Sequence, residues 1–324
     1  HSKMISVEMG KPITESKLEV LKSVWVLEYY AQNAEKFLKN ELIDSDFSES
    51  FIQYDPIGIV FGIMPWNFPY WQVFRFIAPS LMAGNVCILK HASNVSGCAL
   101  LIEKLIKECC PYPNIFRTLI ISSSQVPDVI SNNKVKAVTL TGSEYAGSQV
   151  AMKAGKEIKK TVLELGGSDC FIVLEDADIE KAAKTAVAAR FLNAGQSCIA
   201  AKRFLIHDKI HDTFVAKVEI LIKNLNMGNP LLDETQIGPL AKIEFVDEID
   251  RLVQSSIKKG AKCILGGKKN DSYYYPTLLI NIDERMDVFN YETFGPVFCV
   301  MRINSADEAI RLANNSDYGL GGSV

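Results

Sequence analysis

Two loop segments carry residues whose types are suited to nucleophilic chemistry. Cys198 lies in Asn193-Ala-Gly-Gln-Ser-Cys-Ile199, and Glu164 lies in Leu163-Glu-Leu-Gly-Gly-Ser-Asp169. A thiol nucleophile needs a partner that moves protons, and a glycine-bent loop exposes a side chain that a regular helix or strand would shield. Taken alone, each residue is more often structural, because free cysteine is among the most buried residue types. Together they predict a cysteine nucleophile with a carboxylate acid-base group.

An amide and a hydroxyl are further candidates in the first half of the chain. Asn67 lies between two prolines in Met64-Pro-Trp-Asn-Phe-Pro69. Its stiffened amide could donate to an oxyanion or simply cap the following helix. Ser143 lies in Leu140-Thr-Gly-Ser-Glu-Tyr-Ala-Gly147, where it could bind a phosphate at a helix N-terminus or serve as an N-cap. Both alternatives stay open at each position.

The composition is that of a globular chain. Its 324 residues are 48% hydrophobic and 23% charged, and the net charge of −3 offers no basic field for nucleic acid. The longest apolar stretches, such as Ile57 to Met64, fall well short of the roughly 18 residues that indicate a membrane span. We therefore expect neither a nucleic-acid partner nor a membrane role.

Cysteine usage indicates a reduced protein. Eight cysteines are scattered without regular spacing, no Cys-x-x-Cys occurs, and the four histidines do not cluster with them. This pattern fits free thiols in an intracellular protein and predicts no metal site. We expect a cytoplasmic location. We also expect both ends to be truncated, since the chain begins at His1, so an organelle-targeting peptide would lie outside it.

The elements that must position these residues alternate between strand and helix. Strand candidates lie at 57–63, 86–89, 116–121 and 137–140, and helix candidates lie at 71–83, 98–109 and 145–154. This alternation predicts an α/β fold whose parallel, Rossmann-type sheet is covered by helices. Such sheets bind ligands beyond the carboxyl ends of their strands. Asn67, Lys90 and Ser143 follow strand candidates closely, so a nucleotide-sized site is expected there.

Two other segments frame this sheet. The alternation resumes near Phe171 and continues to 306–313, which predicts a second α/β domain. Before the sheet, 14–40 is predicted to be a long amphipathic helix. Its apolar residues at helical spacing are Leu18, Leu21, Val24, Trp25, Phe37 and Leu38.

We predict two domains and an arm. Residues 1–43 and 55–166 are assigned to a cofactor-binding domain, and 167–324 to a catalytic domain that is incomplete at its carboxyl terminus. The polar segment 44–54 lacks helical periodicity and precedes a proline, so it is interpreted as an extended oligomerisation arm. Glu164 and Cys198 would then meet at a domain cleft, the preferred place for an active site.

Six motifs occur in a fixed order along most of the chain. They are Met64-Pro-Trp-Asn-Phe-Pro69, Leu89-Lys-His-Ala-Ser-Asn94, Thr141-Gly-Ser143, Leu163-Glu-Leu-Gly-Gly167, Gly195-Gln-Ser-Cys198 and Glu292-Thr-Phe-Gly-Pro296. Together they resemble the aldehyde dehydrogenase superfamily. Within it, Trp71-Gln-Val-Phe-Arg75, Lys90-His-Ala-Ser-Asn94 and Gly195-Gln-Ser-Cys-Ile-Ala-Ala-Lys-Arg203 are most similar to bacterial-type succinate-semialdehyde dehydrogenases. The resemblance implies NAD(P)-dependent oxidation of an aldehyde to a carboxylate.

The resemblance also implies catalytic roles. The thiolate of Cys198 would attack the aldehyde carbon to give a thiohemiacetal, which loses hydride and becomes a thioester. Asn67 and the backbone N–H of Cys198 would stabilise the oxyanion. Glu164 would activate the water that hydrolyses the thioester.

Cofactor binding is implied by the same resemblance. The residues at matching positions are Pro65, Trp66, Lys90, Ser93, Gly142, Ser143, Leu165, Glu292 and Phe294. Lys90 and Glu292 would hold the two riboses, Ser143 the pyrophosphate, and Phe294 would lie beside the nicotinamide ribose. A solvated lysine and a helix-cap carboxylate are the structural alternatives for Lys90 and Glu292. Many NAD-using relatives carry a glutamate at the position of Ser93, where it would repel a 2′-phosphate. NADP or NAD is expected, with NADP favoured.

Substrate choice depends on Arg75 and Trp71. Arg75 matches an arginine that binds the substrate carboxylate in some succinate-semialdehyde dehydrogenases, and a structural salt bridge is the alternative. A second arginine of some such enzymes is replaced here by Leu192, which weakens the assignment.

Two other functions were weighed. A CoA-acylating dehydrogenase would pass the thioester to CoA, but Glu164 favours water. A non-catalytic or inactive family member is disfavoured by the presence of Cys198, Glu164 and Asn67. Family members assemble as dimers or tetramers, so a homo-oligomer is expected.

Overall fold

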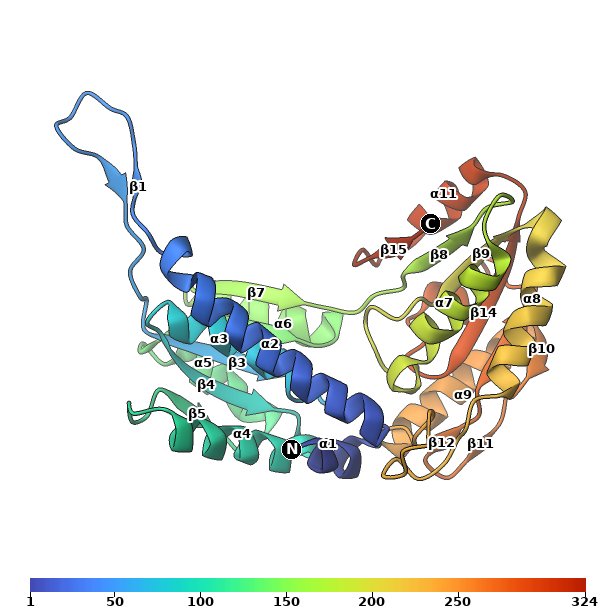
Figure 1. Ribbon diagram of the computed structural model, residues 1–324, viewed down its shortest axis with the longest axis horizontal. Helices are drawn as coiled ribbons and strands as arrows, with labels where there is room; N and C mark the ends of the chain where they lie inside the picture. The colour runs from blue at the N-terminus through green and yellow to red at the C-terminus, as the bar shows by residue number, and fades with distance from the viewer. The chain divides into compact units, whose positions relative to one another are not determined.

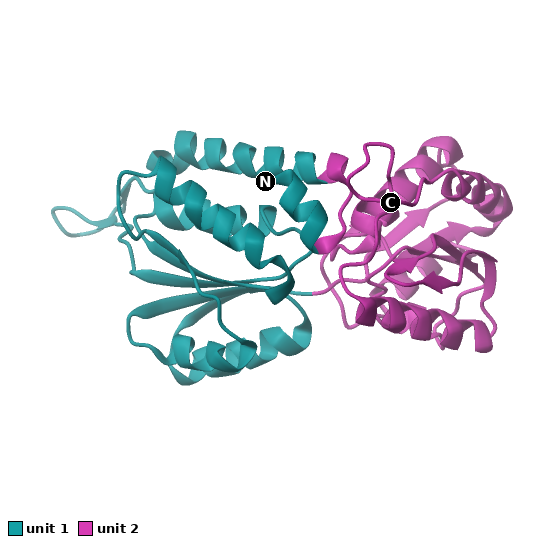
Figure 2. Cartoon of the chain, turned by 90° about the horizontal axis from the view of Figure 1, so that it is seen from below, with its two compact units in different colours: residues 1–8, 16–165 teal, residues 9–15, 166–324 magenta.

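The computed structural model describes residues 1–324, which divide into two compact units (Figure 2). Unit 1 comprises His1–Glu8 and Ser16–Leu165, and unit 2 comprises Met9–Glu15 and Gly166–Val324. The sequence prediction assigns all of 1–43 to the first domain, whereas the structure places 9–15 with unit 2. One reason is that the N–H of Ile13 donates to the carbonyl of Pro230 at 2.7 Å.

A five-stranded parallel sheet forms the centre of unit 1, in the order β5-β4-β3-β6-β7 (Figure 1). Its strands are β3 (Ile59–Met64), β4 (Val86–His91), β5 (Phe116–Thr118), β6 (Val135–Thr141) and β7 (Lys160–Glu164). β4 and β6 lie on opposite sides of β3, so the strand order reverses there. Such a switch point is where open α/β sheets bind ligands.

Four α-helices connect these strands. They are α3 (Trp71–Met82), α4 (Ser96–Cys109), α5 (Val126–Ser131) and α6 (Glu144–Lys156), with short 3₁₀ turns at Ser93–Val95 and Ser123–Gln125. The predicted helices at 71–83, 98–109 and 145–154 are confirmed to within a few residues. Buried Phe61 of β3 and Val138 and Leu140 of β6 form a core with Val150 of α6. This packing fixes the strand ends from which the candidate site residues extend.

The long N-terminal helix buries a different face from the one that its apolar residues predict. α1 spans Ser2–Met9 and α2 spans Ile13–Phe37. Leu18 is 64% exposed and Trp25 58% exposed, whereas Glu19 is only 5% exposed. Glu19 is buried because its Oε1 accepts the N–H groups of Tyr70 and Trp71, at 2.8 and 3.1 Å, where α3 begins. The predicted helix is thus confirmed, but its predicted buried face is wrong.

The segment interpreted as an arm is part of a hairpin. β1 (Glu41–Leu42) pairs antiparallel with β2 (Phe51–Ile52), and in Figure 1 this hairpin projects from the rest of unit 1. All of its residues except Ser50 are exposed, including Leu42 at 78% and Phe47 at 76%.

Unit 2 contains a six-stranded sheet in the order β10-β13-β14-β9-β8-β15. Its strands are β8 (Cys170–Val173), β9 (Arg203–His207), β10 (Lys262–Leu265), β13 (Thr277–Ile280), β14 (Val297–Ile303) and β15 (Gly322–Ser323). All neighbours are parallel except β10 and β13. A separate ribbon pairs β11 (Lys269–Asn270) with β12 (Tyr273–Tyr274).

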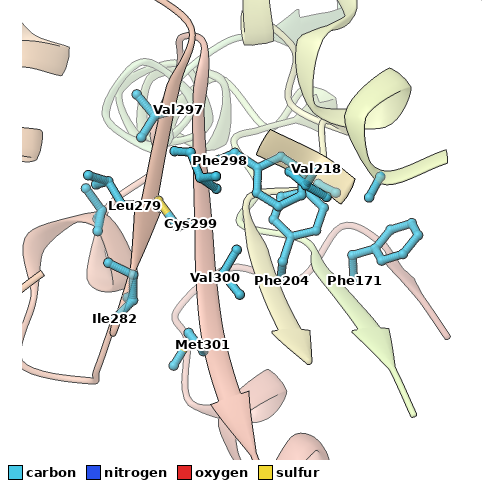
Figure 3. Packing of buried hydrophobic residues seen from close by; sticks show 14 of the residues in the cluster. Phe171, Phe204, Val218, Leu279, Ile282, Val297, Phe298, Cys299, Val300 and Met301 are labelled. Carbon is cyan, nitrogen blue, oxygen red and sulfur yellow. The ribbon is translucent and has the colours of Figure 1, made fainter. Parts of the chain in front are cut away.

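Helices pack on this sheet around an aromatic core. They are α7 (Ile179–Phe191), α8 (Asp208–Lys223), α9 (Ile243–Lys258), α10 (Asp287–Asn290) and α11 (Ala306–Asn314). Phe204 of β9 stacks on Phe298 of β14 with ring centroids 3.6 Å apart, and Phe171 of β8 lies beside Phe204 (Figure 3). This core anchors β9, and the loop that carries Cys198 leads directly into β9. None of the helices in either unit combines the length and the apolar character that a membrane crossing requires.

Candidate active site

The carboxyl ends of the unit 1 strands carry four of the predicted site residues. Asn67 follows β3, Lys90 is the residue before the last one of β4, Ser143 follows β6, and Glu164 ends β7. Because all five strands are parallel, these residues lie at one edge of the sheet. The sequence-based placement beyond a strand end is therefore confirmed for Asn67 and Ser143, whereas Lys90 lies within β4, just before its last residue.

Asn67 is buried, at 4% exposure, and is held by a neighbouring amide. Gln72 of α3 donates its Nε2 to Asn67 Oδ1 at 3.0 Å. The helix-capping alternative is wrong, since the N-cap of α3 is Tyr70 and no side chain caps that helix. This bond uses the oxygen of the Asn67 amide as an acceptor, and Nδ2 is the atom of that amide that carries N–H donors.

Ser143 is the N-cap of α6, as its structural alternative predicts. Its Oγ accepts the N–H of Ala146 at 3.3 Å. The N–H of Gly142 donates to the carbonyl of Glu164 at 2.9 Å, so the start of α6 is tied to the end of β7. The N-terminus of this 13-residue helix is exposed, and such an end attracts anions through its backbone N–H groups.

The side chains at this edge fit a dinucleotide. Lys90 is half-buried, and Ser93 is exposed in the 3₁₀ turn that follows β4. An ammonium and a hydroxyl suit ribose and phosphate oxygens, and no carboxylate occupies position 93 to repel a 2′-phosphate. Pro65 and Trp66, which follow β3, are half-buried. Leu165 follows Glu164 and is also half-buried.

Arg75 contacts Glu164. Its Nη1 lies 3.7 Å from Glu164 Oε2, and its Nη2 donates to Thr141 Oγ1 at 3.3 Å. The salt bridge proposed as the alternative role for Arg75 is therefore present. Trp71, one turn earlier on α3, has the ammonium of Lys22 4.2 Å from its ring centroid.

The chain around Cys198 is bent by three consecutive residues with left-handed backbone angles. Asn193, Ala194 and Gly195 have φ of 53°, 52° and 75°. Gly195 is required because a Cβ there would clash with the carbonyl oxygen of Gly295. Gly167 allows a second close approach, since a Cβ on it would press against the carbonyl of Cys198. Cys198 itself is half-buried.

Two buried cations, which the sequence motifs did not indicate, bind carbonyls of the segment around Cys198. Arg190 of α7 is fully buried and donates to the carbonyls of Ala201, Thr293 and Gly295. Lys202 is fully buried, and its Nζ donates to the carbonyls of Ser197, Cys198 and Ala200. Burial lowers the pKa of Arg190 to about 10 and that of Lys202 to about 8. The only sequence signal for Lys202 was its place within the cysteine motif.

Glu292 is held by the same lysine. Its Oε1 lies 3.2 Å from Lys202 Nζ and accepts the N–H of Gly167 at 3.2 Å. It follows α10, whose C-cap is Tyr291, so the helix-cap alternative for Glu292 is wrong. Phe294, two residues on, is half-buried.

Known proteins resemble this chain over its whole length. Residues 1–324 match the aldehyde dehydrogenase family. A probable succinate-semialdehyde dehydrogenase [NADP(+)] of Synechocystis is 46% identical, with 99% of this chain and 71% of that protein covered. The succinate-semialdehyde dehydrogenase [NADP(+)] of Mycobacterium avium is 47% identical, with 99% and 69% covered.

A solved structure shares the fold. The succinic semialdehyde dehydrogenase from Streptococcus pyogenes, in complex with NADP+ as the cofactor, matches with a TM-score of 0.96 at 35% identity, covering 99% of this chain and 71% of that one. The parallel α/β fold predicted from the sequence is therefore confirmed. With a family match over its whole length and relatives well above 40% identity, this chain belongs to the aldehyde dehydrogenase family.

Proposed function

We propose that this aldehyde dehydrogenase oxidises succinate semialdehyde to succinate, with NADP favoured over NAD as the hydride acceptor. The observation that carries the proposal is Cys198 in a loop that positive-φ residues bend and two buried cations hold. The names of the Synechocystis and Mycobacterium avium relatives support the substrate and the cofactor.

The mechanism begins at Cys198. Its thiolate attacks the aldehyde carbon and forms a thiohemiacetal, whose oxyanion accepts hydrogen bonds from Asn67 Nδ2 and the N–H of Cys198. A bound nicotinamide would supply the hydride acceptor, and loss of hydride from the thiohemiacetal carbon would leave Cys198 in a thioester. Glu164 then takes a proton from water, which attacks the thioester and releases the carboxylate. The thiolate of Cys198 is restored.

The cofactor roles follow from the donor set. Lys90 and Ser93 are proposed to bind the adenosine ribose and its 2′-phosphate, and Ser143 with the adjoining N–H groups the pyrophosphate. Glu292 is proposed to accept hydroxyl hydrogen bonds from the nicotinamide ribose, with Phe294 beside it. Pro65, Trp66, Gly142 and Leu165 would line the nucleotide. No carboxylate at position 93 opposes NADP, which is why it is favoured.

Arg75 is proposed to hold the substrate carboxylate, with Trp71 beside it. The Arg75 side chain is 38% exposed, so a carboxylate from solvent has access to it. A planar fork of N–H donors suits a carboxylate better than an ammonium does.

Self-association is proposed for the hairpin. It exposes Leu42, Phe47 and Phe51, and apolar side chains in that setting are typical of an interface. Light scattering of the protein and of a Phe47→Asp variant would test this, with a smaller species expected for the variant and an unchanged mass opposing it.

The central experiment follows nicotinamide reduction with succinate semialdehyde, propanal and both cofactors, using wild type and Cys198→Ser. We expect Cys198→Ser to abolish oxidation of every aldehyde while it still binds NADP, because hydroxyl is a far weaker nucleophile than thiolate. Cys170→Ser is the matched control, since Cys170 lies in β8 and takes no part in the mechanism. Turnover by Cys198→Ser would remove Cys198 from the chemistry.

A further inference from the structure

One ammonium group collects four acceptors around the nucleophile. Lys202 Nζ donates to the carbonyls of Ser197, Cys198 and Ala200 at 3.0, 2.9 and 3.1 Å. It also lies 3.2 Å from Glu292 Oε1. The lysine side chain is 0% exposed. All five residues belong to unit 2.

The hydrogen bond from Lys202 to the Ser197 carbonyl also affects the N–H of Cys198, because this C=O and this N–H belong to the same peptide unit. That peptide is trans, as all peptide bonds in the chain are. In a trans peptide the C=O and the N–H point in opposite directions. Lys202 therefore fixes the direction of the Cys198 N–H through the Ser197 oxygen. A cation on a carbonyl oxygen also polarises the amide, which strengthens the N–H as a donor.

We propose that Lys202 is a positioning residue for the oxyanion step, aiming and polarising the N–H of Cys198 while it ties the nucleophile loop to Glu292. The inference rests on the proposed function, which makes that N–H an oxyanion donor and Glu292 a ribose ligand. Lys202 acts through the peptide and the carboxylate and does not contact the reacting atoms.

The charge of Lys202 matters for this role as well as its length. A protonated lysine has three N–H donors for the four acceptors, whereas a neutral amine has two. Burying an ammonium is costly, and an apolar side chain of similar volume is often as stable in such a place. A lysine retained only as filler would therefore be replaceable by methionine without any specific effect on the oxyanion.

Two reactions of Cys198 separate positioning from structure. With 4-nitrophenyl acetate, the thiolate attacks the ester carbon, an oxyanion forms, and 4-nitrophenolate leaves to give a thioester. With iodoacetamide, the thiolate displaces iodide and no oxyanion forms. Neither reaction needs the nicotinamide. The Cys198→Ser protein supplies the background from the other seven of the eight cysteines.

The variants are Lys202→Met, which removes the ammonium, and Lys202→Arg, which keeps a cation. Lys223→Met is the matched control, because Lys223 lies on the surface of α8 and pairs only with Glu219 among the acidic residues. We expect Lys202→Met to slow acylation roughly 10- to 100-fold. This decrease does not exceed the one that follows removal of a whole oxyanion donor. Alkylation should change less than about twofold, since it uses no oxyanion.

Lys202→Arg is expected to acylate faster than Lys202→Met but more slowly than wild type. Lys223→Met is expected to acylate at the wild-type rate. Equal losses in acylation and alkylation by Lys202→Met would assign Lys202 a merely structural role and overturn the proposal. Unchanged acylation would overturn it too.

The link to Glu292 has its own readout. Lys202→Met and Glu292→Gln are each expected to raise the dissociation constant for NADP about tenfold, and the double variant little further, since both remove one interaction. If the double variant raised the dissociation constant for NADP by the product of the two single effects, Lys202 would not act through Glu292.

A measurement on wild type applies even where Lys202→Met does not fold. The ratio of acylation to alkylation is expected to fall from about pH 7 to about pH 9.5, as Lys202 loses its proton. The charged groups that act on Lys202 are Glu292, Arg190 and Asp169. A flat ratio would contradict the proposal. Absence of both reactions in wild type would instead overturn the role of Cys198, and with it the proposed function.

Discussion

Arg75 Nη1 lies 3.7 Å from Glu164 Oε2, so the proposed substrate anchor contacts the proposed base. Both side chains are partly exposed, at 38% and 42%, and Arg75 also donates to Thr141. An exposed ion pair contributes at most about 1 kcal/mol, so a substrate carboxylate can compete for Arg75. The Arg75 guanidinium thus has two proposed partners, Glu164 and the substrate carboxylate. Removing Arg75 should affect catalysis differently depending on which partner matters.

The first prediction separates these roles. Arg75→Ala should lower kcat/KM for succinate semialdehyde about 10- to 150-fold, from the roughly 1.5 to 3 kcal/mol of a hydrogen bond to a charged group. For propanal, which lacks a carboxylate, the loss should stay within about fivefold, the value of the exposed pair with Glu164. Steady-state kinetics with both aldehydes measure this. Arg75→Lys should lie in between because it keeps the charge without the fork. Equal losses would assign Arg75 to Glu164 alone.

Glu164 carries the second prediction. Glu164→Gln should lower steady-state kcat by roughly 10²- to 10⁴-fold, because an amide cannot accept the proton of the attacking water. The first turnover should be retained, so rapid mixing with NADP should give a burst of reduced nicotinamide close to one per active site. Glu157→Gln is the matched control, since Glu157 follows α6 and pairs with Lys153. Normal turnover by Glu164→Gln would contradict the assignment of this base.

The sequence predicted the sheets and the strand-end residues because hydrophobic periodicity and small-residue loops are local signals. It misassigned the buried face of α2, since apolar residues usually face the core. There Ser16, Glu19 and Ser23 are buried instead. Each is buried with a partner: Ser16 bonds Ser6, and Ser23 donates to the carbonyl of Glu19. Ser6 of α1 and the Tyr70 and Trp71 N–H groups that Glu19 accepts lie outside α2, so the hydropathy pattern of α2 does not reveal them.

Arg190 and Lys202 were missed for a related reason. A lysine or arginine is normally solvent-exposed, and only the three-dimensional structure brings the carbonyls of Thr293 and Gly295 to Arg190 and the carboxylate of Glu292 to Lys202. Conversely, the sequence indicates the motif glycines, but only the structure shows why glycine is needed there. Gly195 faces the carbonyl of Gly295, which is far away along the chain.

Gly195 supports a third prediction. Gly195→Ala should destabilise unit 2 by about 2 kcal/mol or more, since the left-handed φ alone costs roughly 1 to 2 kcal/mol in an L-residue and the added Cβ clashes with Gly295. Thermal melting and the rate of Cys198 alkylation would measure this. Gly319→Ala is the matched control, because no atom lies within 4 Å of an added Cβ there. Equal melting temperatures for the two variants would refute the strain argument.

The fourth prediction concerns Lys202 and the pH dependence of the free energy of unfolding. Burial lowers its pKa from 10.5 to about 8, with Glu292 opposing that shift. Between these values the unfolded chain binds a proton that the folded chain does not, so the contribution of Lys202 to the free energy of unfolding rises with pH. The slope is at most about 1.4 kcal/mol per pH unit. Below about pH 8 both states are protonated, and the cost of burying the charge is present in full.

Lys202→Met removes this titration and provides the test. The free energy of unfolding of wild type minus that of Lys202→Met should increase from about pH 8 to about pH 10 when measured by denaturant titration. Subtracting the variant cancels the titration of surface groups common to both proteins. A constant difference would mean that Lys202 keeps its ordinary pKa in the folded protein, and a difference that decreases with pH would mean that folding raises this pKa. Either result would contradict a pKa lowered by burial.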